Sequence, residues 1–433
     1  MPEAVLTSWR CSGCGTETRL PWACPQRVDD DNVDHVLARR MIVERVSFVD
    51  TPSESNPFVR FRALSQIYQL ARLAGLSDDD YVNLTRDLDA KVAAVDGRGF
   101  RSTPLTRLGG DTGIWLKHDW QSVGGSHKAR HLMGIALYLT VARRLGARSD
   151  IPPLAIASCG NAALAAAIVA RAIDAPLTVF IPDDAKAQVV AHLQALHATV
   201  VVCPRRPDSP PGDPTYHAFR AAVKQGALPF CVQGPDCGLT IEGGRSLGWE
   251  IAAALADTPQ STRPEHVVVQ VGGGAMASSI AAGLNDFVAI DRLEKSPAIY
   301  AVQTSGCAPL KRAWDAVVAH RGESGSMEAS LTAARRNRSQ HMWPWDNPHS
   351  IAHGILDDET YDWAAVVSAM ASSGGHPLLV DEDDLLQARE IASAAAGATV
   401  SYTGAAGLAA AMKFKPDDQQ RTLVILSGRN RDD

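Results

Sequence analysis

The sequence lacks the features of nucleic-acid-binding, membrane and secreted proteins. Its formal net charge is −6 over 433 residues, which leaves no basic excess to form a face for nucleic acid. Its longest apolar stretches fall short of the roughly 20 residues that a membrane-spanning helix needs. Trp9, Arg10 and nearby cysteines interrupt any apolar run near the start, so no signal peptide is expected. With no repeat or low-complexity tract either, we expect a cytoplasmic protein that binds neither nucleic acid nor membrane.

Regular cysteine pairing is also missing. Eight cysteines in a chain of this size indicate reduced thiols. Cys11, Cys14 and Cys24 resemble half of a zinc ribbon, but the second Cys-x-x-Cys is absent, because Pro-Gln-Arg follows Cys24. Since a tetrahedral zinc site needs a fourth ligand, we predict no metal site and keep these three cysteines only as zinc candidates.

Strand-like and helix-like segments alternate along the chain, as they do in α/β proteins. The length allows two or three domains with large cores. We expect an N-terminal extension over 1–100 with a helical stretch from Phe61 to Val95, a smaller αβ unit over 101–240 and a larger αβ domain over 241–433. The proline-rich stretch Pro204–Pro214 is expected as a surface loop. Strands are expected at Gly113–Lys117, Leu154–Ile156, Leu177–Ile181, Thr199–Val202, Pro229–Val232, Val267–Val271, Ala298–Val302 and Leu423–Leu426.

The first candidate site residue is Lys128, which follows the turn Gly124-Gly125-Ser126-His127 and opens an apolar, helix-forming run. A lysine at the first turn of a helix lies in the positive field of the helix amides. This field disfavours its charged form and keeps an amine available to attack an aldehyde. The cofactor that such an amine usually serves is pyridoxal phosphate. A solvated lysine at a helix start is the alternative, so the prediction depends on three further motifs.

The second motif is the loop Ser158-Cys159-Gly160-Asn161-Ala162, which follows a short apolar strand and enters an alanine-rich helix. A loop at the carboxyl end of a strand presents backbone N–H groups and a helix N-terminus, which suit a substrate carboxylate. Asn161 adds an amide that could hold the phenolic oxygen of the cofactor. Capping of the following helix by Ser158 and Asn161 is the alternative. No catalysis is assigned to Cys159.

The third and fourth motifs also follow apolar strands. Three successive glycines, Gly272 to Gly274, let backbone N–H groups converge on one anion such as a phosphate. Tight strand-to-helix turns also favour glycine, so this loop does not decide alone. Ser427 ends the last strand, where it either binds the pyridine nitrogen of the cofactor or simply ends the strand. A neutral partner leaves the ring nitrogen largely unprotonated, which favours expelling a leaving group.

Together these motifs resemble fold type II pyridoxal phosphate enzymes, the family of threonine and serine dehydratases, threonine synthase, cysteine synthase and the tryptophan synthase β-subunit. The resemblance covers roughly residues 100–430. It implies an α/β fold of two αβ units with the cofactor in the cleft between them, a homodimer, and Lys128 as the catalytic, cofactor-binding lysine. It further implies cofactor binding by His127, Asn161, Gly272, Gly273, Gly274, Ala275, Met276 and Ser427, and substrate binding by Ser126, Ser158, Cys159, Gly160, Asn161 and Ala162.

The motifs do not single out one member of this family. Glu242–Ile251, Ala301–Leu310 and the N-terminal cysteines look like threonine synthase, whereas the triple-glycine loop is similar to dehydratases and the β-subunit. His127 looks like the histidine that helps hold the phosphate in the β-subunit, with a packed structural histidine as the alternative. Ile156 replaces the catalytic glutamate of the β-subunit, which argues against indole chemistry. Ala129 stands where threonine synthase and many dehydratases have an acidic residue.

Two further segments stay open. His353 replaces an aspartate common in the family, and it is either an acid or base in the substrate pocket or a core histidine bonded to backbone. The loop Arg335–His349 is rich in arginine, tryptophan and histidine. It is either a lid or dimer contact or, as we favour, a solvated surface excursion.

The resemblance predicts a lyase that removes a β or γ substituent from an L-amino acid, through an aminoacrylate intermediate, and releases a 2-oxo acid and ammonia. Lys128 would take the α-proton as the general base. Threonine-synthase-like or β-replacement chemistry is the first alternative. A protein that binds the cofactor or an amino acid without turnover is the second. The sequence does not identify the amino acid.

Overall fold

The computed structural model describes residues 9–28, 31–39, 41, 46–110, 112–147, 150–206, 212–414 and 421–430, with 323 and 324 as backbone only. Its largest sheet has the strand order β12-β11-β10-β13-β5-β4. Neighbouring strands are parallel except β4 and β5, which are antiparallel. The strands are β4 (Leu105–Arg107), β5 (Ile114–Lys117), β10 (His266–Gln270), β11 (Ala298–Thr304), β12 (Pro377–Val380) and β13 (Thr422–Ile425).

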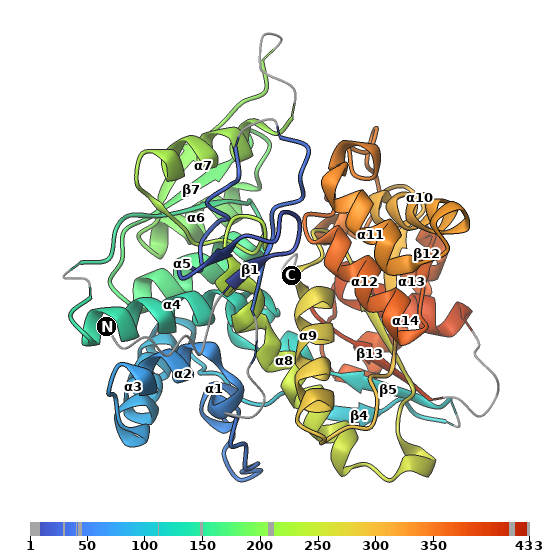
Figure 1. The fold of residues 1–433 in the computed structure, drawn as a ribbon, viewed down its shortest axis with the longest axis horizontal. Helices are drawn as coiled ribbons and strands as arrows, with labels where there is room; N and C mark the ends of the chain where they lie inside the picture. The colour runs from blue at the N-terminus through green and yellow to red at the C-terminus, as the bar shows by residue number, and fades with distance from the viewer. Residues whose placement is uncertain are drawn as a thin grey trace.

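A second, smaller sheet has the order β8-β7-β6-β9, with all neighbours parallel. Its strands are β6 (Leu154–Ala157), β7 (Leu177–Ile181), β8 (Thr199–Val202) and β9 (Leu228–Pro229). Figure 1 shows this sheet with α5, α6 and α7 in the upper left and the helices α10 to α14 with the larger sheet on the right. Parallel strands joined by helices are the arrangement expected of an α/β protein, and the fold class is confirmed.

Fourteen helices, α1 to α14, lie in the described residues. The first seven are α1 (Pro57–Arg60), α2 (Gln66–Leu73), α3 (Asp78–Asp96), α4 (Lys128–Arg144), α5 (Asn161–Ala172), α6 (Ala187–Ala195) and α7 (Pro214–Lys224). The others are α8 (Gly238–Asp257), α9 (Ala275–Ala289), α10 (Pro309–Ser324), α11 (Met327–Arg336), α12 (Trp363–Ser373), α13 (Glu382–Ala396) and α14 (Tyr402–Lys413). Short 3-10 turns include η2 (Arg62–Leu64), η3 (Asp119–Gln121), η4 (Val123–Gly125), η5 (Gln260–Thr262), η6 (Arg338–Gln340) and η7 (His353–Ile355). None of the helices in the described part of the chain is long and apolar enough to cross a membrane.

Helix α8 packs between α4 and α9 at backbone contact distance. A Cβ atom at Gly134 of α4 would lie 2.5 Å from the Cα of Gly243 in α8, and one at Gly248 of α8 would lie 2.9 Å from the Cα of Gly283 in α9. Real Cβ atoms do not approach so closely, so glycine at these contacts allows the three helices to pack. Because α4 begins at Lys128, this packing positions the candidate lysine relative to the larger sheet.

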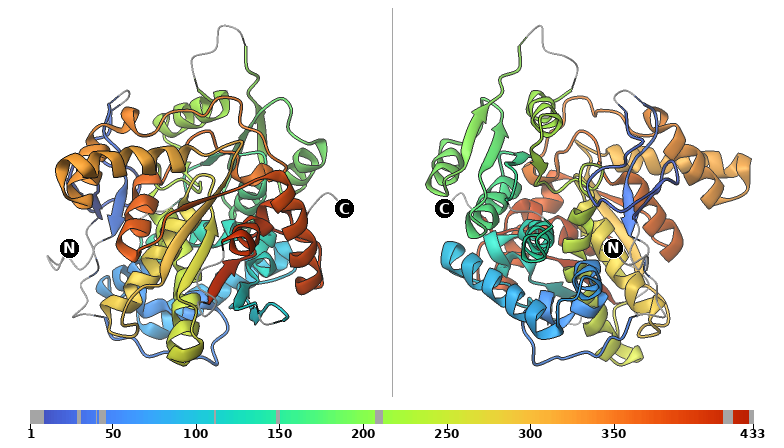
Figure 2. Two further views of the ribbon diagram at one scale, coloured as in Figure 1. Left: turned by 90° about the vertical axis from the view of Figure 1, so that its right-hand side faces the viewer. Right: turned by 60° about the vertical axis from the view of Figure 1, so that its left-hand side comes forward.

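The N-terminal segment forms a third sheet, with the order β2-β1-β3 and antiparallel pairing. Its strands are β1 (Trp9–Cys11), β2 (Glu17–Thr18) and β3 (Leu37–Arg39). The right panel of Figure 2 shows this segment, in blue, beside the yellow helix α9 and the orange helices.

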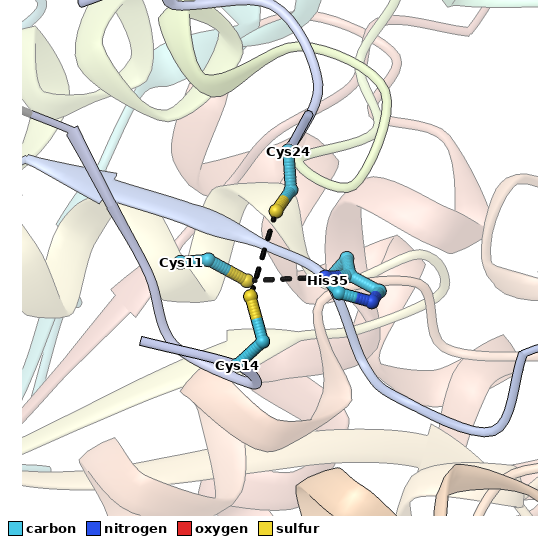
Figure 3. A group of neighbouring side chains, drawn as sticks. All are labelled: Cys11, Cys14, Cys24 and His35. Carbon is cyan, nitrogen blue, oxygen red and sulfur yellow. Dashed lines mark hydrogen bonds between the residues drawn. The ribbon is translucent and has the colours of Figure 1, made fainter. Parts of the chain in front are cut away.

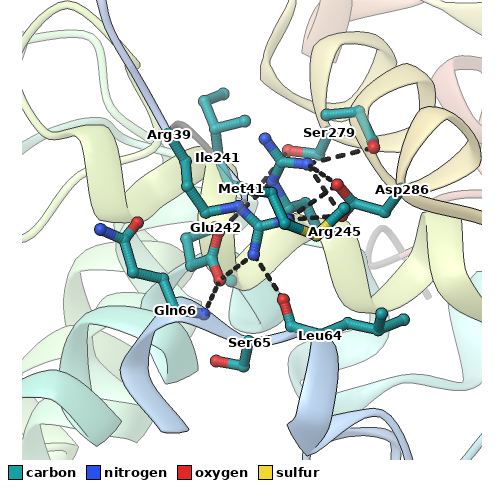
Figure 4. Close-up of polar contacts among 12 residues, drawn as sticks. Arg39, Met41, Leu64, Ser65, Gln66, Ile241, Glu242, Arg245, Ser279 and Asp286 are labelled. Carbon is teal, nitrogen blue, oxygen red and sulfur yellow. Dashed lines mark hydrogen bonds and ion pairs between the residues drawn. The ribbon is translucent and has the colours of Figure 1, made fainter. Parts of the chain in front are cut away.

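Arg39 connects this third sheet to the helices through a buried ionic network (Figure 4). Its guanidinium donates to both carboxylate oxygens of Asp286 in α9 at 2.8 Å and to Glu242 in α8 at 3.1 Å. Arg245 donates to the same Asp286 at 2.9 Å and 3.0 Å. Two arginines and two acids thus balance one another, as buried charges must.

The structure corrects two details predicted from the sequence. The helical stretch predicted from Phe61 to Val95 is broken between α2 and α3, where Gly75 has a positive φ of 93° and Ser77 starts α3 with a capping box. The strand predicted at Pro229–Val232 covers only Leu228–Pro229, because the paired strand β6 offers register partners only to these two residues. Residues 207–211 of the Pro204–Pro214 stretch lie outside the described residues.

The predicted domain boundaries stay a prediction. The sheet pairing crosses the boundary that was predicted at residue 240. Strands β4 and β5, which lie in the 101–240 range, pair within the six-stranded sheet next to β13. Helix α8 runs across position 240 without a break. The predicted ranges 101–240 and 241–433 therefore do not coincide with the division of the chain between the two parallel sheets.

Candidate active site

Lys128 is the first residue of α4, directly after a tight glycine turn. Gly124 and Gly125 have positive φ angles of 66° and 69°, a conformation that glycine adopts without strain. The next residue, Ser126, forms an antiparallel bridge with Gly428, the residue after Ser427. Arg429 N–H also donates to the Gly125 carbonyl at 3.1 Å. The turn and helix predicted around Lys128 are confirmed, and they lie against the segment that ends β13.

Burial is the largest influence on Lys128. It lowers the pKa of the ammonium group, and the attraction of the Asp357 carboxylate partly opposes this. The sequence argument relied on the field of the helix amides, whereas the structure adds loss of solvent around the side chain. Both favour the neutral amine, which is the nucleophilic form.

Asp357 is a site residue that the sequence analysis missed. Burial raises the pKa of its carboxyl group, and Lys128 partly opposes that rise. The only signal in the sequence was its place in the acidic run Asp357-Asp358-Glu359, shortly after the segment flagged for His353. A run of acids usually indicates a solvated loop, so its proximity to Lys128 required the fold.

The glycine loop at 272–274 packs closely around this carboxylate. A Cβ atom at Gly272 would lie 2.3 Å from Asp357 Oδ2, and one at Gly273 would lie 2.9 Å from the Tyr361 ring. Gly274 has a positive φ of 96° and precedes the first turn of α9. A backbone hydrogen bond from Gly273 lowers the pKa of Asp357. The loop therefore already offers an N–H group to an anion at a helix N-terminus, which is the kind of donor that binds a phosphate.

Ser427 lies two residues beyond β13 and is buried. Its Oγ accepts a hydrogen bond from Gln270 Nε2 at 2.6 Å, so its own hydrogen remains available for donation. Gln270 ends β10, two residues before the glycine loop. The third and fourth motifs are thus joined through neighbouring parallel strands, whose carboxyl ends share one edge of the sheet.

His127 takes part in a buried chain of hydrogen bonds. Its Nδ1 lies 3.1 Å from His131 Nε2, and His131 Nδ1 lies 2.8 Å from the Thr240 carbonyl. A carbonyl can only accept, so His131 Nδ1 carries the hydrogen. Burial lowers the pKa of His131 to about 3, so its Nε2 accepts from His127 Nδ1. Neutral His127 then has a lone pair on Nε2, and it can donate to a phosphate only after binding a proton.

The loop Ser158–Ala162 connects β6 to α5. Gly160 is the N-cap residue of α5, and the helix has no side-chain capping bond. The capping role left open for Ser158 and Asn161 is therefore wrong: Gly160 N–H donates to Ser158 Oγ at 3.3 Å, and Asn161 is already the first helical residue. Cys159 and Gly160 are exposed. Within the described residues, no hydrogen bond joins this loop to Lys128.

The buried hydroxyl of Ser126 has no hydrogen-bond partner among the described residues. Buried polar groups are normally paired, so an unpaired one beside Lys128 is a place where a ligand would be accommodated. Together with the donors of the glycine loop and Ser427, it fits an anionic cofactor and an amino-acid substrate.

The structure bears on the two segments left open by the sequence. His353 is exposed in η7, so the alternative of a core histidine is wrong. Most of the loop Arg335–His349 is exposed, as the prediction of a solvated surface excursion requires, but the loop is anchored: Arg338 N–H donates to the Asn32 carbonyl at 2.9 Å and His341 stacks on Trp363. Trp345 N–H donates to the Asp358 carbonyl at 2.9 Å, so the loop supports the segment that carries Asp357.

A cavity of about 230 Å³ lies elsewhere, between the N-terminal sheet and helices α8, α9 and α12. Trp9, Arg39 and Glu242 are among its lining residues, and Lys128 is not. It therefore belongs to the contact between the N-terminal sheet and the helices, and the chemistry argued above does not involve it.

Comparisons with known proteins identify the family and the fold. The family model described as "Pyridoxal-phosphate dependent enzyme" matches residues 98–428. Threonine synthase of Methanosarcina acetivorans is 24% identical over 301 residues, which cover 70% of this chain and 65% of that protein. The mouse protein "Serine dehydratase-like" is 31% identical over 174 residues, covering 40% of this chain and 46% of that protein. The chain thus spans less than two thirds of the length of either relative.

Among solved structures, threonine deaminase isoform 2 of Solanum lycopersicum has a similar fold. The TM-score is 0.57 at 18% identity, and the match covers 83% of this chain and 92% of that one. At this identity, the likeness concerns the fold alone. The family match includes Lys128, the glycine loop and Ser427, but it leaves out the N-terminal sheet.

Proposed function

Because this chain belongs to the pyridoxal-phosphate dependent enzyme family, we propose that it is a lyase that eliminates a β or γ substituent from an L-amino acid, releasing a 2-oxo acid and ammonia. The observation that carries this proposal is the neutral pair Ser427 and Gln270. In the described part of the chain, no carboxylate hydrogen-bonds to Ser427. A neutral partner leaves a pyridine nitrogen largely unprotonated, and this favours loss of a leaving group over a long-lived carbanion.

Pyridoxal phosphate, when bound, supplies the electron sink that stabilises negative charge at the substrate α-carbon. Lys128 would hold the cofactor through its amine, and once the substrate amine has displaced it, the freed lysine amine would take the α-proton as general base. Burial supports both tasks, since it lowers the pKa of Lys128 and keeps the amine neutral at lower pH.

The other proposed site residues bind and orient the cofactor and the substrate. The backbone N–H groups of the glycine loop and the first turn of α9 hold the phosphate, and the amide of Asn161 holds the phenolic oxygen. The hydroxyls of Ser126 and Ser158 and the N–H groups at the start of α5 hold the substrate carboxylate. The proposed cofactor residues are Lys128, His127, Asn161, Gly272, Gly273, Gly274, Ala275, Met276 and Ser427, and the proposed substrate residues are Ser126, Ser158, Cys159, Gly160, Asn161 and Ala162.

Asp357 acts as the general acid that protonates the leaving group. Burial raises the pKa of this carboxyl group above its usual range, so it stays protonated to higher pH than an exposed aspartate does. A phosphate at the same glycine loop raises this pKa further, because two like charges disfavour each other. A hydroxyl leaves more easily as water, so a proton donor near Lys128 supports elimination.

The test is production of 2-oxo acid from L-serine, L-threonine and O-phosphohomoserine by the purified protein. Replacement of Lys128 by Ala is expected to abolish turnover and the visible absorption band of the bound cofactor. The matched control is Lys91→Ala, at an exposed position of α3, which should retain both. A Lys128→Ala variant with wild-type turnover would refute the assignment. A cofactor band without any product would favour the binding-only alternative.

Threonine-synthase-like chemistry is the second candidate, because the Methanosarcina acetivorans relative bears that name. The motif Glu242–Ile251 does not decide between them. In the structure it belongs to buried α8, where Glu242 and Arg245 form the network with Asp286. Release of phosphate from O-phosphohomoserine without ammonia would favour this second candidate over elimination.

A homodimer, which the family resemblance implies, and a cytoplasmic location, which the sequence led us to expect, complete the proposal. Light scattering of the purified protein tests the first of these: a mass near that of one 46.2 kDa chain would exclude the dimer.

A further inference from the structure

Four potential metal ligands converge in the N-terminal segment (Figure 3). Cys11 ends β1, Cys14 follows in the next turn, Cys24 lies in the loop after β2, and His35 lies two residues before β3. Their ligand atoms all lie within 4.8 Å of one another. His35 is the fourth ligand that the sequence analysis did not find, because it lies in no second Cys-x-x-Cys motif.

Two of the distances between ligand atoms match a tetrahedral zinc site. Zinc–sulfur bonds of about 2.3 Å and zinc–nitrogen bonds of about 2.0 Å place neighbouring sulfurs about 3.8 Å apart and sulfur and nitrogen about 3.5 Å apart. Here the Sγ atoms of Cys14 and Cys24 are 3.6 Å apart, and Cys11 Sγ lies 3.4 Å from His35 Nδ1. A disulfide has a sulfur–sulfur distance of about 2.05 Å, so Cys14 and Cys24 are not bonded to each other.

The imidazole of His35 is oriented by a carboxylate, as zinc-binding histidines usually are. Its Nε2 lies 2.9 Å from Asp31 Oδ2, while its Nδ1 faces Cys11. Asp31 is itself held, because its Oδ1 accepts the Val33 N–H at 2.7 Å. With the Nε2 hydrogen directed at Asp31, the lone pair on Nδ1 is directed into the cluster.

The backbone around the cluster is fixed by short contacts. Gly15 N–H donates to the Cys11 carbonyl at 2.9 Å, and Gly15 has a positive φ of 78°. Ser12 N–H donates to the Val36 carbonyl at 2.9 Å, which holds the Cys11–Cys14 turn against the loop of His35. A Cβ atom at Gly13 would lie 2.4 Å from the Asp34 carbonyl oxygen, so only glycine allows this approach.

We propose that Cys11, Cys14, Cys24 and His35 bind one structural Zn²⁺ ion. Three thiolates and an imidazole are a donor set that zinc prefers over magnesium or calcium. Four protein ligands fill the tetrahedron and leave no position for water or substrate, so the site is structural.

The zinc site lies beside contacts that attach the N-terminal segment to α8 and to α11. Next to Cys24, Arg27 pairs with Asp236 at 2.9 Å, at the start of α8. Next to His35, Asp34 N–H donates to the Arg335 carbonyl at 2.7 Å, at the end of α11. Cys24 and His35 thus lie near contacts to segments that are about 100 residues apart in sequence. Because the metal coordinates both ligands, it would link these two contacts through the N-terminal chain.

The experiment measures metal content, and it does not depend on the proposed activity. The full chain is produced with zinc in the medium, dialysed against metal-free buffer and analysed by mass spectrometry of the elements. We expect one zinc per wild-type chain and loss of most of it in His35→Ala and in Cys24→Ser. The matched control is Cys203→Ser, at a cysteine outside the cluster, which should keep one zinc per chain. Wild-type protein without zinc, or both ligand variants with full zinc, would overturn the proposal.

Two further measurements apply even where a ligand variant does not fold. Chelator-treated wild-type protein is titrated with Co²⁺, and the spectrum recorded before Co²⁺ is added is subtracted from each later spectrum. Strong visible bands that saturate at one equivalent support a tetrahedral thiolate site, and their absence counts against it. In Asp31→Asn all four ligands remain, and we expect a 10- to 100-fold weaker zinc affinity in competition with a chromophoric chelator. Unchanged affinity would remove Asp31 from the site.

Discussion

Replacement of Glu250 by Gln tests the buried ionic network around Arg130, two residues after Lys128. Glu250 lies in α8, and its carboxylate accepts from Arg130 Nη1 and from Lys117 Nζ, both at 2.6 Å. Arg130 lies in the first turn of α4, two residues after Lys128, and also donates to Asp119 at 2.9 Å. The side chains of Glu250 and Arg130 are 2% and 1% exposed, so water cannot replace a lost partner.

The expected cost follows from the charges left behind. Glutamine preserves the shape but removes the negative charge, which leaves two buried cations with Asp119 as their remaining acid. Removal of one partner from a buried ion pair costs about 3–5 kcal/mol. Burial lowers the pKa of Lys117, so the estimate depends mainly on Arg130, whose pKa is raised by Asp119 and Glu250 despite its burial. We therefore expect a loss of about 3–5 kcal/mol in the free energy of unfolding.

The assay is urea unfolding of the cofactor-loaded protein at neutral pH, followed by circular dichroism and tryptophan fluorescence. The control is Asp315→Asn, which breaks an exposed pair with Lys311 in α10 and should cost less than about 1 kcal/mol. A Glu250→Gln variant that loses no more than this control would refute the reasoning.

The pH dependence gives a second check on the same variant. Burial alone would raise the pKa of Glu250, but the charges of Arg130 and Lys117 outweigh it and lower this pKa. A carboxylate with a lowered folded-state pKa stabilises the fold above its unfolded pKa of about 4.3, and this stability is lost as pH falls through the folded-state value. The difference between wild type and variant should therefore shrink below about pH 4.

Two further predictions concern the proposed chemistry. Ser427→Asp places a carboxylate at the position proposed to contact the ring nitrogen. We therefore expect a shifted visible spectrum and elimination slowed by at least about tenfold, which is about 1.4 kcal/mol in the barrier. Unchanged kinetics would exclude Ser427 from the site. Asp357→Asn removes the proposed acid while keeping the shape of the side chain. We expect a lower kcat and loss of the fall in rate at alkaline pH, which in the wild type reflects deprotonation of Asp357 with its raised pKa. A variant that keeps the wild-type pH profile would show that Asp357 donates no proton.

Local motifs predicted much of the fold and part of the site. The glycine turn before Lys128 and the three glycines of residues 272–274 have the positive φ angles or close backbone contacts that only glycine supports. Such requirements act within a few residues, so they are visible in a single sequence. The strand at Pro229–Val232 was overestimated because apolar residues also fill a buried turn: Phe230 and Cys231 are fully buried without continuing the strand.

Contacts between distant segments were not predictable in the same way. Asp357 and Lys128 are 229 positions apart, the difference of their residue numbers, and neither sequence context points to the other. The hydrogen-bond chain from His127 to Thr240 depends on how α4 packs against α8. His35 joins the cysteine cluster because β3 pairs with β1, which returns the chain to Cys11.

The sequence by itself determined the order of strands and helices, the reactive lysine at a helix start and the chemical types that follow each strand. These properties depend on neighbouring residues, through backbone conformation and the alternation of apolar and polar side chains. Only the tertiary structure decided which acid faces Lys128, which tautomer His127 adopts and which residue completes the cysteine cluster. Each of these depends on burial and on charges from segments far along the chain, because the pKa of a side chain and the ligands of a metal are set by what surrounds them in space.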